Sequence, residues 1–342
     1  MFGAGSRGQV AAECERLGLR RVLLIGGGSA DGVLVELRAA LGARCVGRFG
    51  DVAQHVPGDR ADACVALAME TRADGAVAVG GGSAIGFAKV LALQLGLVIL
   101  AVPTTLAGSE MTPVHGVTTD GVKRTGSDPV VLPKVVVYDP ELLMTLPATL
   151  LASSGMNALA HAVEALWLPN ATPYSDAVAG AAVSALARSL PAATASGATL
   201  KARAESLIGA HLGSLALGAT GTGLHHRVCH VLGGSFGLPH ADVHSAVLPH
   251  ISALNLPAAP AAAAALARAL ETSGSAAGAI FNLAATIGAA TSLSALGLKE
   301  DDLGTVVDAV MATPVANPRA VEAAELALAL RAAWSGERPA NN

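Results

Sequence analysis

The sequence predicts an α/β dinucleotide-binding domain followed by an all-helical domain, and three observations support this. In the first half, continuous apolar runs alternate with helical stretches, which is typical of a parallel sheet covered on both faces. After Asp139-Pro140 the chain becomes rich in alanine and leucine at helical spacing. Its 342 residues are enough for two ordinary domains. We therefore expect one domain over residues 1–149, a second over 150–342, and a ligand cleft between them.

The elements of the first domain follow from its apolar runs. Strands are predicted at 21–25, 75–79 and 97–102, where each run stops at a glycine or a proline. Helices are predicted at 33–42 and 84–95 from the spacing of their apolar residues.

In the second half, proline and glycine divide the helical pattern into stretches of ordinary helix length. The predicted breaks lie at 169–173, 196–197, 239, 257–260, 273–274 and 314–318.

Composition excludes several classes of protein. A net charge of −4 provides no basic surface for nucleic acid or for anionic membranes. The mean hydropathy is +0.53, but the two long uncharged runs, 90–109 and 243–267, are interrupted by proline and polar residues and do not predict membrane spans. The first ten residues hold no apolar signal core. Four widely spaced cysteines fit reduced thiols, so we expect a cytoplasmic enzyme.

Two glycine turns follow predicted strands and open predicted helices. The second consists of Gly80, Gly81, Gly82 and Ser83. Backbone N–H groups at such a helix start, with no side chains in the way, suit a pyrophosphate. The sequence departs from the usual G-x-G-x-x-G pattern, and a packing role for the turn is the alternative. The first turn, residues 26–29, is either a packing device or a wall of the adenosine site.

Small hydroxyl residues follow the strand at 97–102. Thr104, Thr105 and Ser109 lie where the carboxyl end of a parallel strand places ligand contacts. They are candidates for contacts with ribose or phosphate, and the alternative is a capped turn that starts a helix.

Histidines are concentrated in the second domain. His226 and His230 are four residues apart on one predicted helix face, and Asn157 and His161 repeat this spacing. His240 follows a glycine-proline loop. Two helical pairs and one loop histidine predict a functional site, whereas a lone buried histidine is usually structural. The other histidines of this region are interpreted as structural: His211, His225, His244 and His250.

Several long motifs resemble the iron-containing alcohol dehydrogenase superfamily and, within it, the maleylacetate reductase family. They are GGGSAIGFAK (80–89), ILAVPTTLAGSEMTP (99–113), GVKRTG (121–126), LPKVVVYDPELLMTLP (132–147), SGMNALAHAVEALW (154–167) and LHHRVCHVLGGSFGLPHADVHSAVLPH (224–250). The resemblance implies a dehydroquinate synthase-like fold, NADH or NADPH as cofactor, and a homodimer.

The resemblance also implies roles for the histidines. Metal-dependent members bind their ion with one aspartate and three histidines, and the matching positions here are Asn157, His161, His226 and His240. Asn157 removes the anionic ligand, as in maleylacetate reductases, so we expect that no metal is required. His230 matches the family's catalytic histidine. Gly86 also agrees with maleylacetate reductases, whereas Val315 and Ala316 replace the aromatic residues that are common before Asn317.

The implied reaction reduces the C=C bond of maleylacetate to 3-oxoadipate. The expected general acid is His230, and the expected donors to an enolate are His161, His226 and His240. Lys123 and Arg124 are candidates for binding the substrate carboxylates, or else a solvated surface pair. Lys134 is a candidate for the nicotinamide ribose, or else for a salt bridge at the end of a strand.

Two other functions remain open. One is a metal-dependent alcohol dehydrogenase that reduces an aldehyde. The other is a cofactor-binding protein without turnover. The expected partners are a small dicarboxylate substrate and a second copy of the chain, with no nucleic acid and no membrane.

Overall fold

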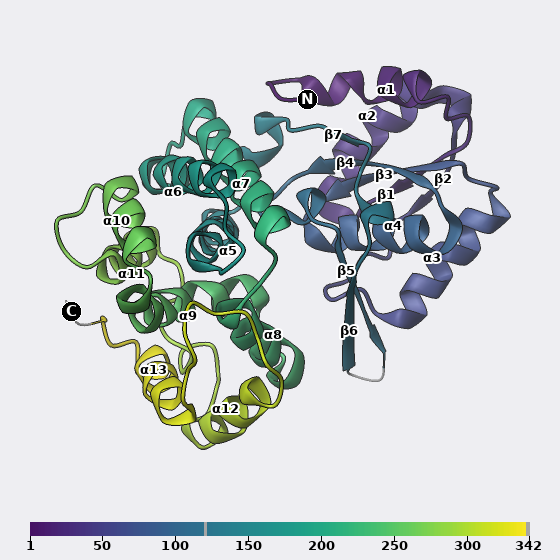
Figure 1. Cartoon of the computed structure of the whole chain (residues 1–342). Coiled ribbons are helices and arrows are strands. Elements are labelled where there is room, and N and C mark those ends of the chain that lie inside the picture. The colour runs from purple at the N-terminus through teal and green to yellow at the C-terminus, as the bar shows by residue number, and fades with distance from the viewer. Residues whose placement is uncertain (120–121, 340–342) are drawn as a thin grey trace. The chain divides into compact units, whose positions relative to one another are not determined.

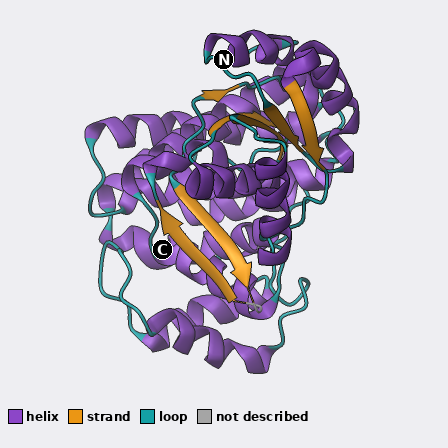
Figure 2. Cartoon of the chain, turned by 90° about the vertical axis from the view of Figure 1, so that its right-hand side faces the viewer, coloured by secondary structure: helices purple, strands orange, loops and turns teal. Residues whose placement is uncertain are grey.

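The computed structural model describes residues 1–119 and 122–339, except for the side chains of residues 122 and 123. Its contacts divide the chain into two compact units, Met1–Leu146 and Pro147–Asn342. The first combines helices with strands, and the second is helical (Figures 1 and 2). The predicted fold class is confirmed.

A parallel sheet forms the centre of the first unit. Its strands, in spatial order, are β2 (Cys45–Phe49), β1 (Val22–Ile25), β3 (Gly75–Gly80), β4 (Val98–Pro103) and β7 (Val135–Val136). All neighbouring pairs are parallel. The strands predicted from the apolar runs correspond to β1, β3 and β4.

Alternate residues of each strand face two different helix layers. The helices are α1 (Val10–Arg16), α2 (Asp31–Leu41), α3 (Gly58–Glu70) and α4 (Gly82–Leu95). Leu23 and Ile25 of β1 belong to a core cluster with residues of α3 and α4. Val22 and Leu24 belong to a second cluster with residues of α1 and α2. This burial on both faces explains why the strands are continuously apolar.

The strand order reverses at β1 and β3, which makes this the switch point of the sheet. The chain runs from β1 outward to β2, returns to β3, and then continues to β4 on the other side. Ligands of open α/β sheets bind beside the carboxyl ends of strands at such a point. Both glycine turns start there, because Gly26 follows β1 and Gly81 follows β3.

An antiparallel hairpin extends from the first unit and was not predicted. It consists of β5 (Val114–Thr119) and β6 (Val122–Ser127). Its residues lack a clear apolar alternation, so the sequence carried little signal for it. The Nζ of Lys89 on α4 donates to the carbonyls of Thr112 (2.8 Å) and Val114 (2.6 Å), and this buried contact fixes the start of the hairpin. Burial lowers the pKa of Lys89 to about 8.

The N-terminal residues add a short pairing beside β7. The backbone N–H of Gly3 donates to the Tyr138 carbonyl (3.0 Å), and the N–H of Tyr138 donates to the Met1 carbonyl (2.9 Å). Residues 1–3 therefore cover part of an edge that would otherwise present unpaired backbone groups.

The second unit is built from helices. They are α5 (Ala148–Trp167), α6 (Pro173–Thr194), α7 (Leu200–Thr220), α8 (Leu224–Phe236), α9 (His240–Asn255), α10 (Pro260–Ala269), α11 (Ala276–Thr286), α12 (Leu303–Met311) and α13 (Ala323–Ser335). Each predicted break lies between two of these helices. Two breaks were not predicted: the one between α7 and α8, at Gly221–Gly223, and the one between α11 and α12, at 287–302.

Helix α5 is the central helix of this unit. It is buried continuously from Leu151 to Trp167 and packs against α6, α7 and α9. A helix surrounded in this way is expected to be apolar on all sides. The polar side chains of Asn157, His161 and Glu164 on α5 therefore require partners inside the protein.

Helix α6 is, among the described residues, long and apolar enough to cross a bilayer by length and composition alone. In the structure α6 packs against both α5 and α7, and part of its surface is exposed.

The close approach of α7 to α5 depends on glycine. A Cβ added at Gly213 would lie 2.7 Å from the backbone oxygen of Ala158, whereas one added at Gly180 of α6 would meet nothing within 4 Å. We expect Gly213→Ala to lower the free energy of unfolding by about 1–3 kcal/mol, because backbone atoms must separate. The matched variant Gly180→Ala should raise it by about 0.5–1 kcal/mol, because alanine favours helix. Urea denaturation measures both, and equal effects would contradict the close packing.

Candidate active site

Six imidazole rings gather in the helical unit. They belong to His161 on α5, to His225, His226 and His230 on α8, and to His240 and His244 on α9. Each ring centroid lies within 4.5–6.3 Å of at least two others of the group. The structure thus brings together all four histidines predicted as site residues.

The buried carboxylate of Glu164 on α5 binds the start of α8 and one ring of this group. Its carboxylate accepts hydrogen bonds from the backbone N–H groups of Gly223 (2.9 Å) and His225 (2.7 Å), at the start of α8. It also accepts from Nδ1 of His226 (2.5 Å). A negative charge at a helix N-terminus is stabilised by the helix dipole. Burial raises the pKa of Glu164, but the contacts with His226 outweigh burial and lower it overall, so the carboxylate is ionised.

The contact with Glu164 determines which nitrogen of His226 faces the site. Because Nδ1 donates to the carboxylate, Nε2 of neutral His226 carries a lone pair. This atom is buried and, in the part of the chain that the structure describes, has no hydrogen-bond partner. We expected His226 to be a donor. With this geometry it donates from Nε2 only when the ring is protonated.

His161 has a similar arrangement on α5. Its Nδ1 lies 3.4 Å from Oγ of Ser214, which itself donates to the Ala210 carbonyl (2.8 Å). Ser214 therefore accepts from His161, which leaves a lone pair on Nε2. Burial, together with His226 and His225, lowers the pKa of His161 well below its ordinary value. This ring is neutral, so its Nε2 is an acceptor.

His230 and His240 are the half-buried members of the group. Their rings stack with centroids 5.9 Å apart and an angle of 15° between the planes. Partial exposure gives both rings access to protons from solvent, which suits an acid that is used in every turnover. Asn157 is buried one helical turn before His161 on α5.

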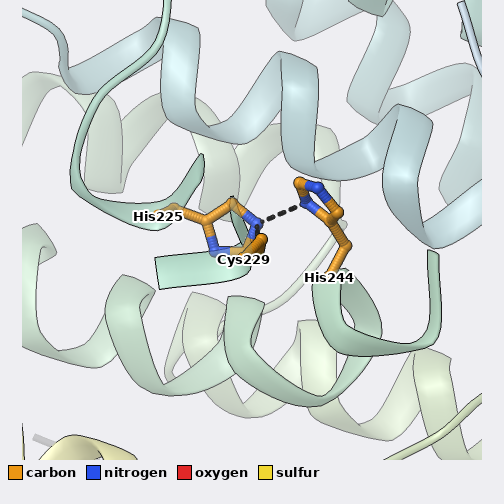
Figure 3. Close-up of side chains that lie close together, drawn as sticks. All are labelled: His225, Cys229 and His244. Carbon is orange, nitrogen blue, oxygen red and sulfur yellow. Dashed lines mark hydrogen bonds between the residues drawn. The ribbon is translucent and has the colours of Figure 1, made fainter. Parts of the chain in front are cut away.

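His225, Cys229 and His244 form a buried cluster (Figure 3). Nε2 of His225 lies 2.8 Å from Nδ1 of His244 and 3.6 Å from Sγ of Cys229. Nε2 of His244 in turn lies 3.2 Å from Nε2 of His240. Sequence reasoning interpreted His225 and His244 as structural. Their spacing four residues from Cys229 and His240, respectively, was the available signal that they share helix faces with the cluster and the site.

In the first unit, the second glycine turn lies beside the hydroxyl segment. A Cβ added at Gly81 would lie 2.9 Å from Oγ1 of Thr105, and one added at Gly82 would lie 3.8 Å from Cβ of Ser109. Only glycine fits at position 81 without displacing Thr105. Thr104 donates its N–H to the Gly80 carbonyl (3.1 Å), which holds the two segments together.

The first glycine turn is packed more tightly. A Cβ added at Gly26 would lie 2.8 Å from the Val79 oxygen, so this glycine serves the close approach of β1 and β3. A Cβ added at Gly28 would have no neighbouring atom within 4 Å. The packing interpretation therefore holds for Gly26.

Three further predicted residues belong to the first unit. Lys134 is exposed and donates its N–H to Ile99, near the start of β4 rather than at its carboxyl end. Lys123 and Arg124 were expected in a loop, but both belong to strand β6. Arg124 is exposed, whereas the side chain of Lys123 lies outside the described residues.

The segment around Val315 lines a separate cavity of about 240 Å³ in the helical unit, together with Leu224 and Asn317. The amides of Asn317 and Asn255 pair reciprocally, with distances of 2.8 and 2.9 Å. This pair anchors the segment to the end of α9.

Glu164→Gln tests the role of the buried carboxylate. The amide keeps one acceptor but loses the charge that faces α8 and His226. We expect the free energy of unfolding to fall by about 1.5–3 kcal/mol, the range for hydrogen bonds to a charged group. The partly exposed pair of Glu325 with Arg319 provides the control, because Glu325→Gln removes a charge that solvent screens and should cost clearly less. Comparable losses in the two variants would show that Glu164 does not support the group.

Comparison with known proteins agrees with this architecture. A family model described as iron-containing alcohol dehydrogenase matches residues 1–140, and one described as the C-terminal part of the Fe-containing alcohol dehydrogenase family matches residues 151–334. A protein named maleylacetate reductase from Sphingobium indicum is 46% identical over 321 residues, which cover 94% of this chain and 91% of that protein.

Solved structures give the same result. Maleylacetate reductase from Rhizobium sp. strain MTP-10005 has a TM-score of 0.94 at 40% identity and covers 99% of this chain and 96% of that chain. Sulfoacetaldehyde reductase from Bifidobacterium kashiwanohense, solved in complex with NAD⁺, has a TM-score of 0.88 at 25% identity. The match covers 96% of this chain and 95% of that chain. The chain therefore belongs to the iron-containing alcohol dehydrogenase family.

Proposed function

We propose that this chain is a maleylacetate reductase that uses NADH or NADPH to reduce the C=C bond of maleylacetate, giving 3-oxoadipate. The observation that carries the proposal is the group of imidazole rings beside Asn157, in a chain that matches maleylacetate reductases over almost its whole length. A neutral amide at position 157 and several imidazoles suit proton transfer to an electron-rich intermediate.

The second glycine turn fits a dinucleotide. Gly81 leaves the space beside Thr105 that a Cβ would fill, and Gly82 starts α4, whose first N–H groups are directed toward the turn. Thr104, Thr105 and Ser109 supply hydroxyl groups near it. When bound, reduced nicotinamide supplies the hydride. The complex of NAD⁺ with a related reductase supports this class of cofactor.

The histidines then supply the proton that completes the reduction. Hydride addition at the alkene carbon remote from the ketone moves an electron pair onto the conjugated carbonyl and forms an enolate. His230, half-buried and next to His226, donates the proton to the other alkene carbon and is protonated again from solvent. His240, also half-buried, lies near the same carbonyl in this proposal. The exposed guanidinium of Arg124 remains a candidate for a substrate carboxylate.

The residues present do not fit an iron site. Asn157 offers a neutral amide, and Nε2 of His240 faces Nε2 of His244 at 3.2 Å. Among the described residues, the group of three possible ligands whose atoms all lie within 4.8 Å of one another is His225, Cys229 and His244. The three histidines at the family's ligand positions do not form such a group. The proposed reaction therefore uses no metal.

One observation favours the second candidate, a metal-dependent alcohol dehydrogenase. His226 is held by Glu164 and presents a buried lone pair, an arrangement typical of metal-bound histidine. Metal analysis of protein purified without chelator separates the two functions. Stoichiometric iron or zinc, with loss of activity on chelation, would favour the alcohol dehydrogenase.

His230→Asn is the direct test of the proposed reaction. We expect kcat for maleylacetate to fall by about 10²- to 10⁴-fold, because a positioned proton donor is lost. The KM for NADH should change little, and His211→Asn on α7 should retain nearly full activity. Spectrophotometric NADH consumption measures these values. Wild-type consumption with simple aldehydes but not with maleylacetate would overturn the proposal, and no consumption with any carbonyl would indicate a silent cofactor-binding protein.

Gly81→Asp should act on the cofactor instead. The carboxylate would occupy the space beside Thr105 and repel a pyrophosphate, so the Kd for NADH should rise by more than about tenfold, equivalent to 1.4 kcal/mol. Gly81→Ala adds bulk without charge and should have a smaller effect. Fluorescence titration with NADH gives both constants. Unchanged binding in folded Gly81→Asp would rule out this turn as the pyrophosphate site.

We further infer a homodimer, a cytoplasmic location and a role in the catabolism of aromatic compounds. The family resemblance supports the dimer and the pathway. The four cysteines, all free in the structure, fit a reducing compartment. Light scattering coupled to size-exclusion chromatography tests the dimer.

A further inference from the structure

The His244 ring lies in the middle of the imidazole group. Its centroid is 4.5 Å from that of His240, 4.8 Å from that of His226 and 6.3 Å from that of His161. These three are the histidines at the family's ligand positions. His244 is completely buried on α9, one helical turn after His240. The imidazole of His244 therefore lies next to all three of these side chains.

Hydrogen bonds link three of the rings into a chain. His225 contacts His244 through Nε2 and Nδ1 (2.8 Å), and His244 contacts His240 through the Nε2 atoms of both rings (3.2 Å). Figure 3 shows the contact between His225 and His244, and the second contact extends the chain to the half-buried His240. A neutral imidazole has one N–H donor and one acceptor, so the tautomer of one ring determines those of the next.

The direction of this chain follows from His225. Its Nδ1 is buried and has no hydrogen-bond partner among the described residues. A buried N–H without an acceptor costs more than a bare acceptor, so the proton of His225 belongs on Nε2. His225 then donates to Nδ1 of His244. The single proton of His244 lies on Nε2 and is donated to Nε2 of His240, whose own proton lies on Nδ1.

We propose that His244 is a positioning residue, whose imidazole takes the place of an ion among His161, His226 and His240 and holds His240 in its Nδ1–H tautomer. The proposal rests on the proposed function for its effect on catalysis, but not for the tautomer. His225 is a second positioning residue, because its hydrogen bond orients His244.

Two substitutions at His244 separate its contacts. The amide of His244→Asn reaches about as far as Nδ1 and keeps the contact with His225, but not the one with His240. The longer His244→Gln places an amide near Nε2 and can donate to His240. We expect kcat to fall by about 10- to 100-fold in His244→Asn, the range for partners that orient site residues. His244→Gln should recover part of the loss, and the KM for NADH should stay constant in both.

The matched control is His250→Asn, because His250 is buried on the same helix, faces Phe281 and lies outside the chain of imidazoles. It should keep kcat within about twofold, well under 1.4 kcal/mol.

The tautomer provides a measurement independent of activity. Nitrogen NMR of ring-labelled histidines, assigned with His240→Gln, should show the proton of His240 on Nδ1 in the wild type and a shift toward Nε2 in His244→Asn. A proton on Nε2 of His240 in the wild type overturns the proposal, even if His244→Asn fails to fold. So does a folded His244→Asn with unchanged tautomer and kcat.

Metal analysis supplies the remaining outcomes. Stoichiometric metal that is lost in Cys229→Ala would show that His225, Cys229 and His244 are ligands, and this would overturn the proposal. Metal that is retained in that variant and lost in His161→Ala would overturn it as well. If wild-type protein does not reduce maleylacetate but His240 carries its proton on Nδ1, the proposed function fails and the positioning role of His244 stands.

Discussion

The helical unit depends on one buried carboxylate. Glu164 lies on the central helix α5 and accepts hydrogen bonds from the first turn of α8 and from His226. Without a partner, a charge at this depth would be strongly unfavourable. Its partners are the donors of a helix start and an imidazole, so the contacts that stabilise the charge also determine where α8 begins and how His226 is turned. The same carboxylate therefore stabilises the fold and orients a histidine of the candidate site.

The α/β unit depends on a different constraint: backbone N–H groups must be accessible to a ligand, without side chains that cover them. The reversal of strand order at β1 and β3 opens the edge of the sheet, and glycine at position 81 keeps this edge free of side chains. Lys89 and Thr105 hold the neighbouring segments in place through hydrogen bonds to backbone atoms. The N–H of Thr104 donates to the Gly80 carbonyl and ties this segment to the turn.

Apolar periodicity predicted the sheet strands β1, β3 and β4 and the helix breaks marked by proline, because burial on both faces leaves a clear trace in composition. It did not predict the hairpin of β5 and β6, whose residues face partly outward and follow no strict alternation. The four site histidines were predicted from their spacing and from the family resemblance. Glu164 was missed because a single acidic residue in a helix gives no sign that it faces another helix.

His225 and His244 show a further limit of the sequence. Each was interpreted as a single buried histidine, although each stands one helical turn from another polar group, Cys229 and His240 respectively. Spacing along one helix indicates which residues share a face. It does not show that the faces of α8 and α9 meet, and this meeting converts two ordinary buried rings into a connected chain.

The reciprocal amide pair of Asn255 and Asn317 has a consequence for the conditions under which the enzyme works. Neither side chain titrates, and neither carries a charge that dissolved ions would screen. The anchor that ties the loop beside Leu224 to α9 is therefore indifferent to acidity and to ionic strength, whereas the nearby pair of Arg319 and Glu325 weakens in concentrated salt. Of the residues that line this cavity, Asn317 therefore keeps its contact with α9 when the salt concentration changes, whereas the contact of Arg319 does not.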